Sequence, residues 1–432
     1  MNYYSLNKTA PNVTFREATI KGQAPDKGLY FPESIPAVDP FIIKSINDVS
    51  KEELAFKIMQ PYIGNEIDDE SLHRIVSETI NFPFPLISVT ENIYSLELFH
   101  GPTLAFKDVG ARFMSRCLGY FSQQQKNKIT VLVATSGDTG GAVANGFLGV
   151  DGVDVIILYP SGKVSPVQEL QLTTCGQNIT ALEVNGSFDD CQSMVKDAFM
   201  DAALNKKFQL TSANSINVAR WLPQQLYYFF AYQQWKEKDE PPVISVPSGN
   251  FGNICAGLLA HISGLPVKHF IAACNVNDSV PEYLRNGNYQ SKTAVPTISN
   301  AMDVGNPSNF VRVLELFQHN YQNITEKISG FTVSDDITRQ TIAGVYQQRN
   351  YTLDPHGAVA YYALEQYLQQ HPQQKGIFLE TAHPVKFPGT VEAITGKKIK
   401  LPDSAVYLFE KEKRSIQMNN SFEDFKEWLL NK

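Results

Sequence analysis

The feature that most constrains the fold is a recurring pattern in which a short apolar run is followed by a glycine-rich turn and then a helical stretch. Five such runs are rich in β-branched residues, namely Ile129–Ala134, Val153–Tyr159, Val243–Val246, His269–Cys274 and Gly376–Glu380. Continuous apolar runs of this kind are typical of strands buried on both faces of a parallel sheet. Because parallel strands need crossover connections, which are usually helices, the pattern predicts an α/β protein with open, mostly parallel sheets.

The length of the chain indicates more than one domain. Its 432 residues exceed the roughly 250–300 at which single hydrophobic cores stop growing. Residues 1–95 lack the strand–turn–helix pattern and are expected to form a partly helical segment, interrupted near Pro61, that packs on the core. The charged, proline-containing stretch Glu237–Pro242 predicts a boundary. We therefore expect a smaller α/β lobe over residues 96–238 and a larger one over residues 239–432.

Composition limits the kinds of molecule that the chain can bind and the cell compartment in which it is expected. Lys and Arg total 37 against 44 Asp and Glu, whereas proteins that grip a nucleic-acid backbone usually carry the opposite balance. The longest apolar runs are too short to span a bilayer, and the first residues contain no apolar signal stretch. The five cysteines include no C-x-x-C pair, so neither a zinc site nor a disulfide framework is expected. These features favour a cytoplasmic protein with no metal, nucleic-acid or membrane partner.

A first candidate anion site follows the run Val243–Val246. The chain turns there through five residues before a helix begins, namely Gly249, Asn250, Phe251, Gly252 and Asn253. Glycine lets the backbone approach a ligand closely, and the free N–H groups of a helix N-terminus point at whatever lies there. The turn predicts a main-chain cradle for a phosphate, with a plain strand-to-helix turn as the alternative.

A second loop has the same design and follows the run Ile129–Ala134. It adds the hydroxyls of Thr135, Ser136 and Thr139 to the backbone donors, and its helix is expected to begin around residue 142. Asp138 could simply cap that helix, as an Asp at such a turn usually does. Two such loops at strand ends indicate one or two ligands with more than one negative group.

Lys107 stands among apolar neighbours just before a predicted helix over Val109–Phe121. Desolvation there would lower the pKa of the amine, so that its neutral form could attack a carbonyl. The alternatives for an isolated lysine are that it extends to the surface or pairs with Asp108.

Several motifs together resemble a known family. The stretches Phe106-Lys107-Asp108, Ser136-Gly137-Asp138-Thr139-Gly140 and Ser248-Gly249-Asn250-Phe251-Gly252-Asn253 occur in the order seen in fold-type II pyridoxal-phosphate enzymes, which share the tryptophan synthase β-like fold. The chain resembles the threonine synthases of the long bacterial and fungal branch, with further similar stretches at residues 24–32, 214–217, 306–310 and 380–384. Val311 and Val385 are small departures, standing where an acidic residue and an alanine are usual.

This resemblance implies a set of cofactor contacts. Lys107 would form a Schiff base with pyridoxal 5′-phosphate, and Phe106 would lie near the ring. The turn at residues 249–253 would hold the phosphate through its N–H groups, and the hydroxyl of Thr381 would donate to the pyridine nitrogen. Asp138 would stand beside the ring hydroxyl, where it would have to be protonated or tilted away.

The resemblance also implies a substrate with two anionic ends. Its carboxylate would be bound by Thr135, Ser136 and Thr139, and its γ-phosphate by Asn214, Ser215 and Arg220. Arginine can grip a phosphate with two parallel hydrogen bonds, although a surface salt bridge is the alternative for Arg220. The implied lyase reaction is γ-elimination followed by β-addition of water, which converts O-phospho-L-homoserine and water to L-threonine and phosphate, the last step of threonine biosynthesis.

Two other functions stay open at this point. A serine/threonine dehydratase or a β-replacement enzyme of the same fold would share the lysine and both loops. A non-catalytic, ligand-binding paralogue is the second alternative, which the presence of Lys107 disfavours. The sequence is compatible with a monomer and with a homodimer.

Overall fold

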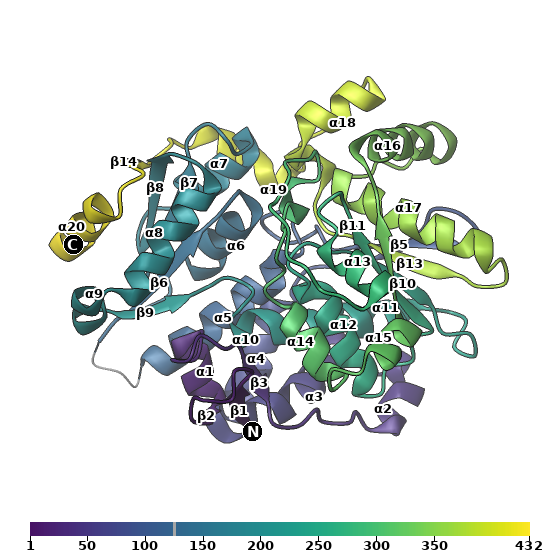
Figure 1. Cartoon of the computed structure of the whole chain (residues 1–432), viewed down its shortest axis with the longest axis horizontal. Coiled ribbons are helices and arrows are strands. Elements are labelled where there is room, and N and C mark those ends of the chain that lie inside the picture. Colours follow the sequence, from purple (N-terminus) through teal and green to yellow (C-terminus); the bar gives the residue numbers. More distant parts are fainter. Residues whose placement is uncertain (124–126) are drawn as a thin grey trace.

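The computed structural model describes residues 1–123 and 127–432. Two α/β lobes lie side by side in Figure 1, and the N-terminal segment, in purple, lies beneath them. Each lobe is built on its own sheet, and the N-terminal segment carries a third. The fold class predicted from the alternating pattern is therefore confirmed.

A six-stranded sheet forms the centre of the right-hand lobe (Figure 1). Its strands run in the order β12 (Ile328–Thr332), β11 (His269–Cys274), β10 (Val243–Pro247), β13 (Gly376–Glu380), β5 (Ile93–Glu97) and β4 (Leu86–Ser88). All neighbours are parallel except β4 and β5. The helices that follow these strands are α12 (Gly252–Ile262), α13 (Ser279–Asn286), α14 (Phe310–Leu316), α15 (Tyr321–Lys327), α16 (Asp335–Arg349), α17 (Pro355–Gln370) and α18 (Pro388–Thr395). Because β11 and β13 are buried throughout and β10 is buried except at Pro247, their continuous apolar sequences match a sheet covered on both faces.

A five-stranded parallel sheet forms the left-hand lobe (Figure 1). Its order is β14 (Ile416–Asn419), β8 (Ile179–Asn185), β7 (Val153–Pro160), β6 (Ile129–Ala134) and β9 (Gln209–Ser212). Its connecting helices are α5 (Lys107–Ser122), α6 (Asp138–Phe147), α7 (Pro166–Thr173), α8 (Phe188–Met200) and α9 (Ala202–Lys207). The helices α10 (Val218–Trp221), η3 (Leu222–Gln225) and α11 (Leu226–Gln234) lead from β9 toward the larger lobe.

The N-terminal segment combines a small antiparallel sheet with helices. The sheet contains β1 (Asn2–Ser5), β2 (Val13–Thr14) and β3 (Tyr30–Pro32). The helices are α1 (Phe15–Lys21), α2 (Pro40–Lys44), α3 (Lys51–Ile63) and α4 (Asp69–Thr79). The predicted interruption lies at Gly64, which ends α3 with a φ of 62°, and Pro61 sits inside the last turn of α3. Glycine tolerates this left-handed backbone without steric cost, which makes it the residue that ends the helix.

All five predicted strands are present at or within one residue of their expected bounds. The two helix starts differ more. The helix expected around residue 142 begins at Asp138, and the helix expected at Val109 begins at Lys107 itself. Lys107 and Asp138 therefore lie in the first turns of α5 and α6. The prediction places both residues in the loops before these helices, because it locates each helix start from the apolar residues alone.

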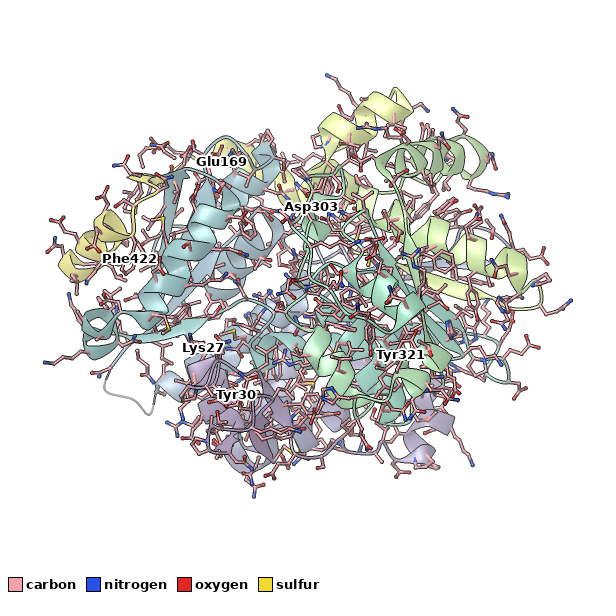
Figure 2. All side chains as sticks on the ribbon, viewed as in Figure 1. Lys27, Tyr30, Glu169, Asp303, Tyr321 and Phe422 are labelled. Carbon is pink, nitrogen blue, oxygen red and sulfur yellow. The ribbon has the colours of Figure 1, made fainter. Side chains whose placement is uncertain are left out.

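The sheets do not follow the expected division at residues 95 and 238. Strands β4 and β5 pair in the six-stranded sheet, although they precede the smaller lobe in the chain. Strand β14 pairs with β8, and α20 (Phe422–Asn431) packs on α8, so the C-terminus belongs to the smaller lobe. Figure 2 shows Phe422, at the start of α20, on the outer side of that lobe. Parallel pairing with a distant strand leaves no local signal in a sequence.

Within the described parts of the chain, no helix is both long and apolar enough to cross a membrane.

Candidate active site

Lys107 is brought to the end of strand β13 by a short antiparallel pairing. The N–H of Phe106 donates to the carbonyl of Thr381 at 2.9 Å, and the N–H of His383 donates to the carbonyl of Leu104 at 3.0 Å. Leu104 has a φ of 59°, the left-handed conformation that turns the loop into helix α5. This pairing sets Thr381 beside the residue that precedes the lysine, as the predicted site requires.

The environment of Lys107 lowers the pKa of its amine. Desolvation is the largest cause, and the cations of Lys386 and Arg220 act in the same direction, while Asp138 opposes them. The Lys107 Nζ lies 5.8 Å from the centre of the Phe106 ring. A desolvated amine with a lowered pKa has a larger neutral fraction near pH 7, which a nucleophile or a general base needs.

Asp138 forms a buried ion pair that the sequence analysis missed. Its Oδ1 lies 2.7 Å from Nζ of Lys386, which is 0% exposed, and accepts from Nε2 of Gln168 at 2.8 Å. Burial by itself would raise the pKa of Asp138, but Lys386 and Lys107 outweigh it and hold that pKa well below its ordinary value. This direction favours the ionised carboxylate, so of the two expected arrangements, protonated or tilted away, it disfavours the protonated one.

Asp138 does not cap its own helix either. The N-cap of α6 is Gly137, and Oγ1 of Thr135 accepts from the N–H groups of Gly137 and Gly140 at 3.0 and 2.9 Å. Thr135 thus stabilises the turn, while Ser136 and Thr139 are partly exposed at the start of the helix. Of the three predicted carboxylate-binding hydroxyls, the structure places Thr135 in a capping role and leaves the other two accessible.

The turn between β10 and α12 has the geometry of an anion cradle. A Cβ on Gly249 would lie 2.8 Å from both the carbonyl oxygen of Ala301 and the Cα of Met302, so a larger residue does not fit. Phe251 has a φ of 61° and precedes the first turn of α12. In residues 1–123 and 127–432, the N–H groups of residues 249–253 find no acceptor. These free donors fit a phosphate group.

Side chains at the same turn also leave donors available. Oδ1 of Asn253 accepts from the Tyr228 hydroxyl at 2.9 Å, whereas its Nδ2 is buried and has no acceptor among the described residues. Asn250 uses its Oδ1 to accept from Oγ of Ser308 at 3.1 Å, which fixes the outer edge of the turn. A buried unpaired amide is costly in a folded protein, and a ligand oxygen would satisfy it.

The loop at residues 213–217 lies next to this cradle. A Cβ on Gly252 would be 3.6 Å from the Cβ of Ser215, whose Oγ accepts from Nδ2 of Asn309 at 3.1 Å. The Oδ1 of Asn214 is buried without a partner in the described part of the chain. The structure therefore brings together the two sequence regions assigned to the two phosphates.

Arg220 is buried rather than paired at the surface. Its Nη1 donates to the carbonyl of Ala213, and its Nε has no acceptor among the described residues. Burial lowers the pKa of Arg220 to about 10, so the guanidinium stays charged near pH 7. A buried cation without a carboxylate partner is what an anionic ligand would complete.

A second arginine that sequence reasoning missed supports the same loop. Arg312 donates through Nη1 to the carbonyl of Ser215 at 3.2 Å and through Nη2 to those of Ile216 and Tyr30 at 2.7 and 3.0 Å. Its Cζ lies 4.4 Å from the ring centre of Trp221. The similar stretch at residues 306–310 and the departure at Val311 lie directly before Arg312, but nothing local distinguishes Arg312 from a surface arginine.

Comparisons with known proteins match the chain over nearly its whole length. Family models match residues 83–379 (pyridoxal-phosphate dependent enzyme), 2–80 (threonine synthase N terminus) and 357–429 (threonine synthase, C-terminal). The threonine synthase of Haemophilus influenzae is 46% identical over 431 residues, covering 100% of both chains.

Solved structures give the same result. The crystal structure of threonine synthase from Escherichia coli is 42% identical with a TM-score of 0.92, covering 100% of both chains. That of pyridoxal-phosphate-bound threonine synthase from Brucella melitensis is 34% identical with a TM-score of 0.93, covering 100% of this chain and 99% of the other. The fold, the lysine at the end of β13, the cradle at residues 249–253 and these full-length matches lead to one conclusion: the chain belongs to the threonine synthase family of pyridoxal-phosphate-dependent enzymes.

Proposed function

We propose that this chain converts O-phospho-L-homoserine and water to L-threonine and inorganic phosphate as a pyridoxal-phosphate-dependent lyase. The observation that carries the proposal is the adjacency of two anion-binding elements, the cradle at residues 249–253 and the loop of Ser215. One suits the phosphate of the cofactor, and the other suits a phosphate on the substrate. A fold-type II enzyme acting on an unphosphorylated amino acid would not need the second.

The residues present fit pyridoxal phosphate. Its phosphate would be held by the N–H groups of residues 249–253 and by Nδ2 of Asn253, and its carbonyl carbon would be linked to Nζ of Lys107. Thr381 would donate to the pyridine nitrogen, and Phe106 would lie along the ring. When bound, the cofactor supplies an electron sink that stabilises negative charge on the substrate carbons.

The chain's own residues supply binding and proton transfer. We infer that Ser136 and Thr139 bind the substrate carboxylate at the N-terminus of α6, where helix N–H groups favour negative charge. Arg220, Asn214 and Ser215 bind the γ-phosphate and fix its departure direction. The neutral amine of Lys107 then removes the proton from the α-carbon and returns it, because its lowered pKa makes it a base near pH 7.

We also propose that the enzyme works in the cytoplasm and is a monomer or a homodimer. Sedimentation equilibrium of the purified protein distinguishes the two assemblies, since a monomer has the chain mass of 48.2 kDa and a homodimer has twice that mass.

The activity is tested by following phosphate release and threonine formation together. O-phospho-L-homoserine should give equal amounts of both products, whereas O-phospho-L-serine and L-threonine should give little turnover. Deamination of L-threonine without threonine formation from O-phospho-L-homoserine would contradict the proposal.

Substitution of the lysine tests its assigned role. Lys107→Ala should lower the rate of threonine formation by about a thousandfold or more, because both the covalent link to the cofactor and the group that carries the proton are lost. The variant should still bind pyridoxal phosphate weakly through residues 249–253, without the visible band that borohydride removes. Lys128→Ala, which changes an exposed lysine, is the matched control. Turnover that survives in Lys107→Ala would show that another residue is the base.

A further inference from the structure

Lys386 is a completely buried lysine whose three hydrogen-bond partners lie close to the candidate active site. It ends the 3₁₀ helix η5 (Pro384–Lys386), five residues after Thr381. Its Nζ contacts Oδ1 of Asp138 at 2.7 Å and donates to the carbonyl of Thr103 at 2.8 Å and to Oε1 of Gln171 at 3.0 Å. An ammonium group has three donors, so each of them is used. A lysine is rarely buried in this way without a specific partner.

Thr103 connects this lysine to the loop that carries Lys107. Its N–H and hydroxyl donate to the two carboxylate oxygens of Asp108 at 2.9 and 2.5 Å, while its carbonyl accepts from Lys386 and from Nε2 of Gln171. Thr103, four positions before Lys107, is therefore fixed by Asp108 through its N–H and hydroxyl groups and by Lys386 and Gln171 through its carbonyl. Lys386 thus fixes both the start of α6, through Asp138, and the entrance to α5.

The charges around Lys107 explain why this contact matters. The charged groups that influence its amine are Asp138 from α6, Lys386 from η5 and Arg220 from α10, while Asp108 on its own helix is bonded to Thr103. Asp138 is the anion that interacts with both lysines. Without Lys386, its carboxylate would have Lys107 as its remaining lysine counter-ion. An ion pair with a buried carboxylate favours the protonated amine strongly, which would disable Lys107 as a base.

We propose that Lys386 is a positioning residue of the active site, which occupies the carboxylate of Asp138 so that this carboxylate does not capture the nitrogen of Lys107. The proposal rests on Lys107 being the reactive lysine, and it does not depend on which amino acid is the substrate. It also explains how an ionised aspartate can stand beside the reactive lysine without trapping it.

The test uses full-length holoenzyme and follows the pH dependence of its visible absorption band, which reports protonation at the Lys107 nitrogen. Lys386→Met should raise the midpoint of this titration by about one pH unit or more, because a cation is lost and Asp138 turns to Lys107. Asp138→Asn should lower the midpoint, since the anion that favours protonation is gone. The double variant Lys386→Met/Asp138→Asn should return close to the wild-type midpoint, because both charges are absent. Lys386→Arg, which keeps the cation, should stay closer to wild type than Lys386→Met.

A purely structural lysine would not produce this pattern. Circular dichroism confirms that each variant is folded, and if Lys386→Met does not fold, Lys386→Arg and Asp138→Asn still test the proposal, since the first should leave the midpoint close to wild type and the second should lower it. Because Lys386 acts through Asp138, Lys386→Met should raise the midpoint more in the wild-type background than in the Asp138→Asn background. An unchanged midpoint in Lys386→Met, an equal rise in the two backgrounds, or a midpoint that Asp138→Asn does not lower would overturn the proposal. Neither result depends on turnover of O-phospho-L-homoserine, so failure of the proposed function is recognised separately.

Discussion

At the residue scale, the site is made of charges that are buried and only partly matched by opposite charges. Arg220, Arg312 and Lys386 are each at most 3% exposed, and of these Lys386 contacts a carboxylate, that of Asp138. Desolvation makes such cations expensive unless hydrogen bonds or a ligand compensate them. Lys386 uses all three of its donors, whereas the Nε atoms of Arg220 and Arg312 have no acceptor among the described residues. Arg312 still donates through its two Nη atoms to four protein oxygens, while Arg220 donates to the carbonyl of Ala213, so Arg220 is the arginine with more donors left for a substrate phosphate.

Arg220→Lys tests that assignment. Lysine keeps the charge but cannot form two parallel hydrogen bonds, so kcat/KM for O-phospho-L-homoserine should fall about ten- to hundredfold, mainly through KM. Inhibition by inorganic phosphate should weaken in parallel. The matched control is Arg112→Lys, on helix α5, where Nη2 of Arg112 donates to the carbonyl of Glu78. This variant should change neither kcat/KM nor the inhibition by phosphate by more than about twofold. Unchanged kinetics in Arg220→Lys would remove Arg220 from the phosphate site.

At the element scale, the C-terminal strand is tied to the smaller lobe by one carboxylate. Glu183 on β8 accepts from the hydroxyls of Tyr159 and Ser161 at 3.0 and 2.7 Å, and from Ser415, just before β14, at 2.9 Å. Nζ of Lys413 lies 2.8 Å from the same carboxylate. The edge strand β14 is therefore held by side chains in addition to its pairing with β8.

This tie should depend on pH. Burial alone would raise the pKa of Glu183, but hydrogen bonds from Lys413 and the serine and tyrosine hydroxyls lower it from 4.5 to about 2. Because the folded-state pKa is depressed, the stabilisation is complete above about pH 4.5 and is lost as the pH falls toward about 2. Glu183→Gln should therefore lower the free energy of unfolding by about 1–2 kcal/mol at pH 7, and the difference from wild type should shrink at pH 3.

Urea unfolding at both pH values measures this difference. Glu412→Gln, which changes a side chain that is 82% exposed, is the control and should leave stability unchanged at either pH. A gap between Glu183→Gln and wild type that stays constant with pH would contradict the role given to the charge.

The limits of sequence reading are clearest at the element scale. The five buried strands could be predicted because a strand covered on both faces must be apolar along its length. The two anion loops could be predicted because their glycines and hydroxyls follow those strands directly. Lys386 could not be found in this way, since its partners Asp138, Thr103 and Gln171 lie more than 200 residues earlier in the chain. Strand β14 was missed for a similar reason, because its four residues alternate apolar and polar over too short a stretch to predict a strand, and its partner β8 is distant in the chain.

At the scale of the whole molecule, Arg312 joins three regions. Its donors reach Tyr30 in the N-terminal segment, the loop of Ser215 and Ile216, and Oδ1 of Asn309 in its own lobe. Figure 2 shows Tyr30 in the N-terminal segment, below the two lobes. The N-terminal segment is therefore connected directly to the proposed phosphate loop, which gives this segment a part in shaping the site.

Arg312→Lys should weaken that connection. A lysine cannot reach all of these oxygens, so the free energy of unfolding should fall by about 2–3 kcal/mol, and KM for O-phospho-L-homoserine should rise because the Ser215 loop loosens. Urea unfolding and steady-state kinetics measure the two effects, with the exposed Arg339→Lys as control. A loss of stability with an unchanged KM would separate Arg312 from the site.

The return of β14 and α20 to the smaller lobe has a consequence for how the lobes can move. The chain passes between the two sheets after β5, again between β9 and β10, and a last time between β13 and β14. Two lobes joined by a single connecting segment can rotate about it in many directions. Lobes joined by three segments are restricted to the motions that all three segments allow. Cutting the chain at Glu237–Pro242 would leave the C-terminal fragment still holding an edge strand of the other lobe. The two fragments should consequently stay associated after such a cut, because each fragment contributes strands to the sheet of the other: β4 and β5 to the six-stranded sheet and β14 to the five-stranded sheet.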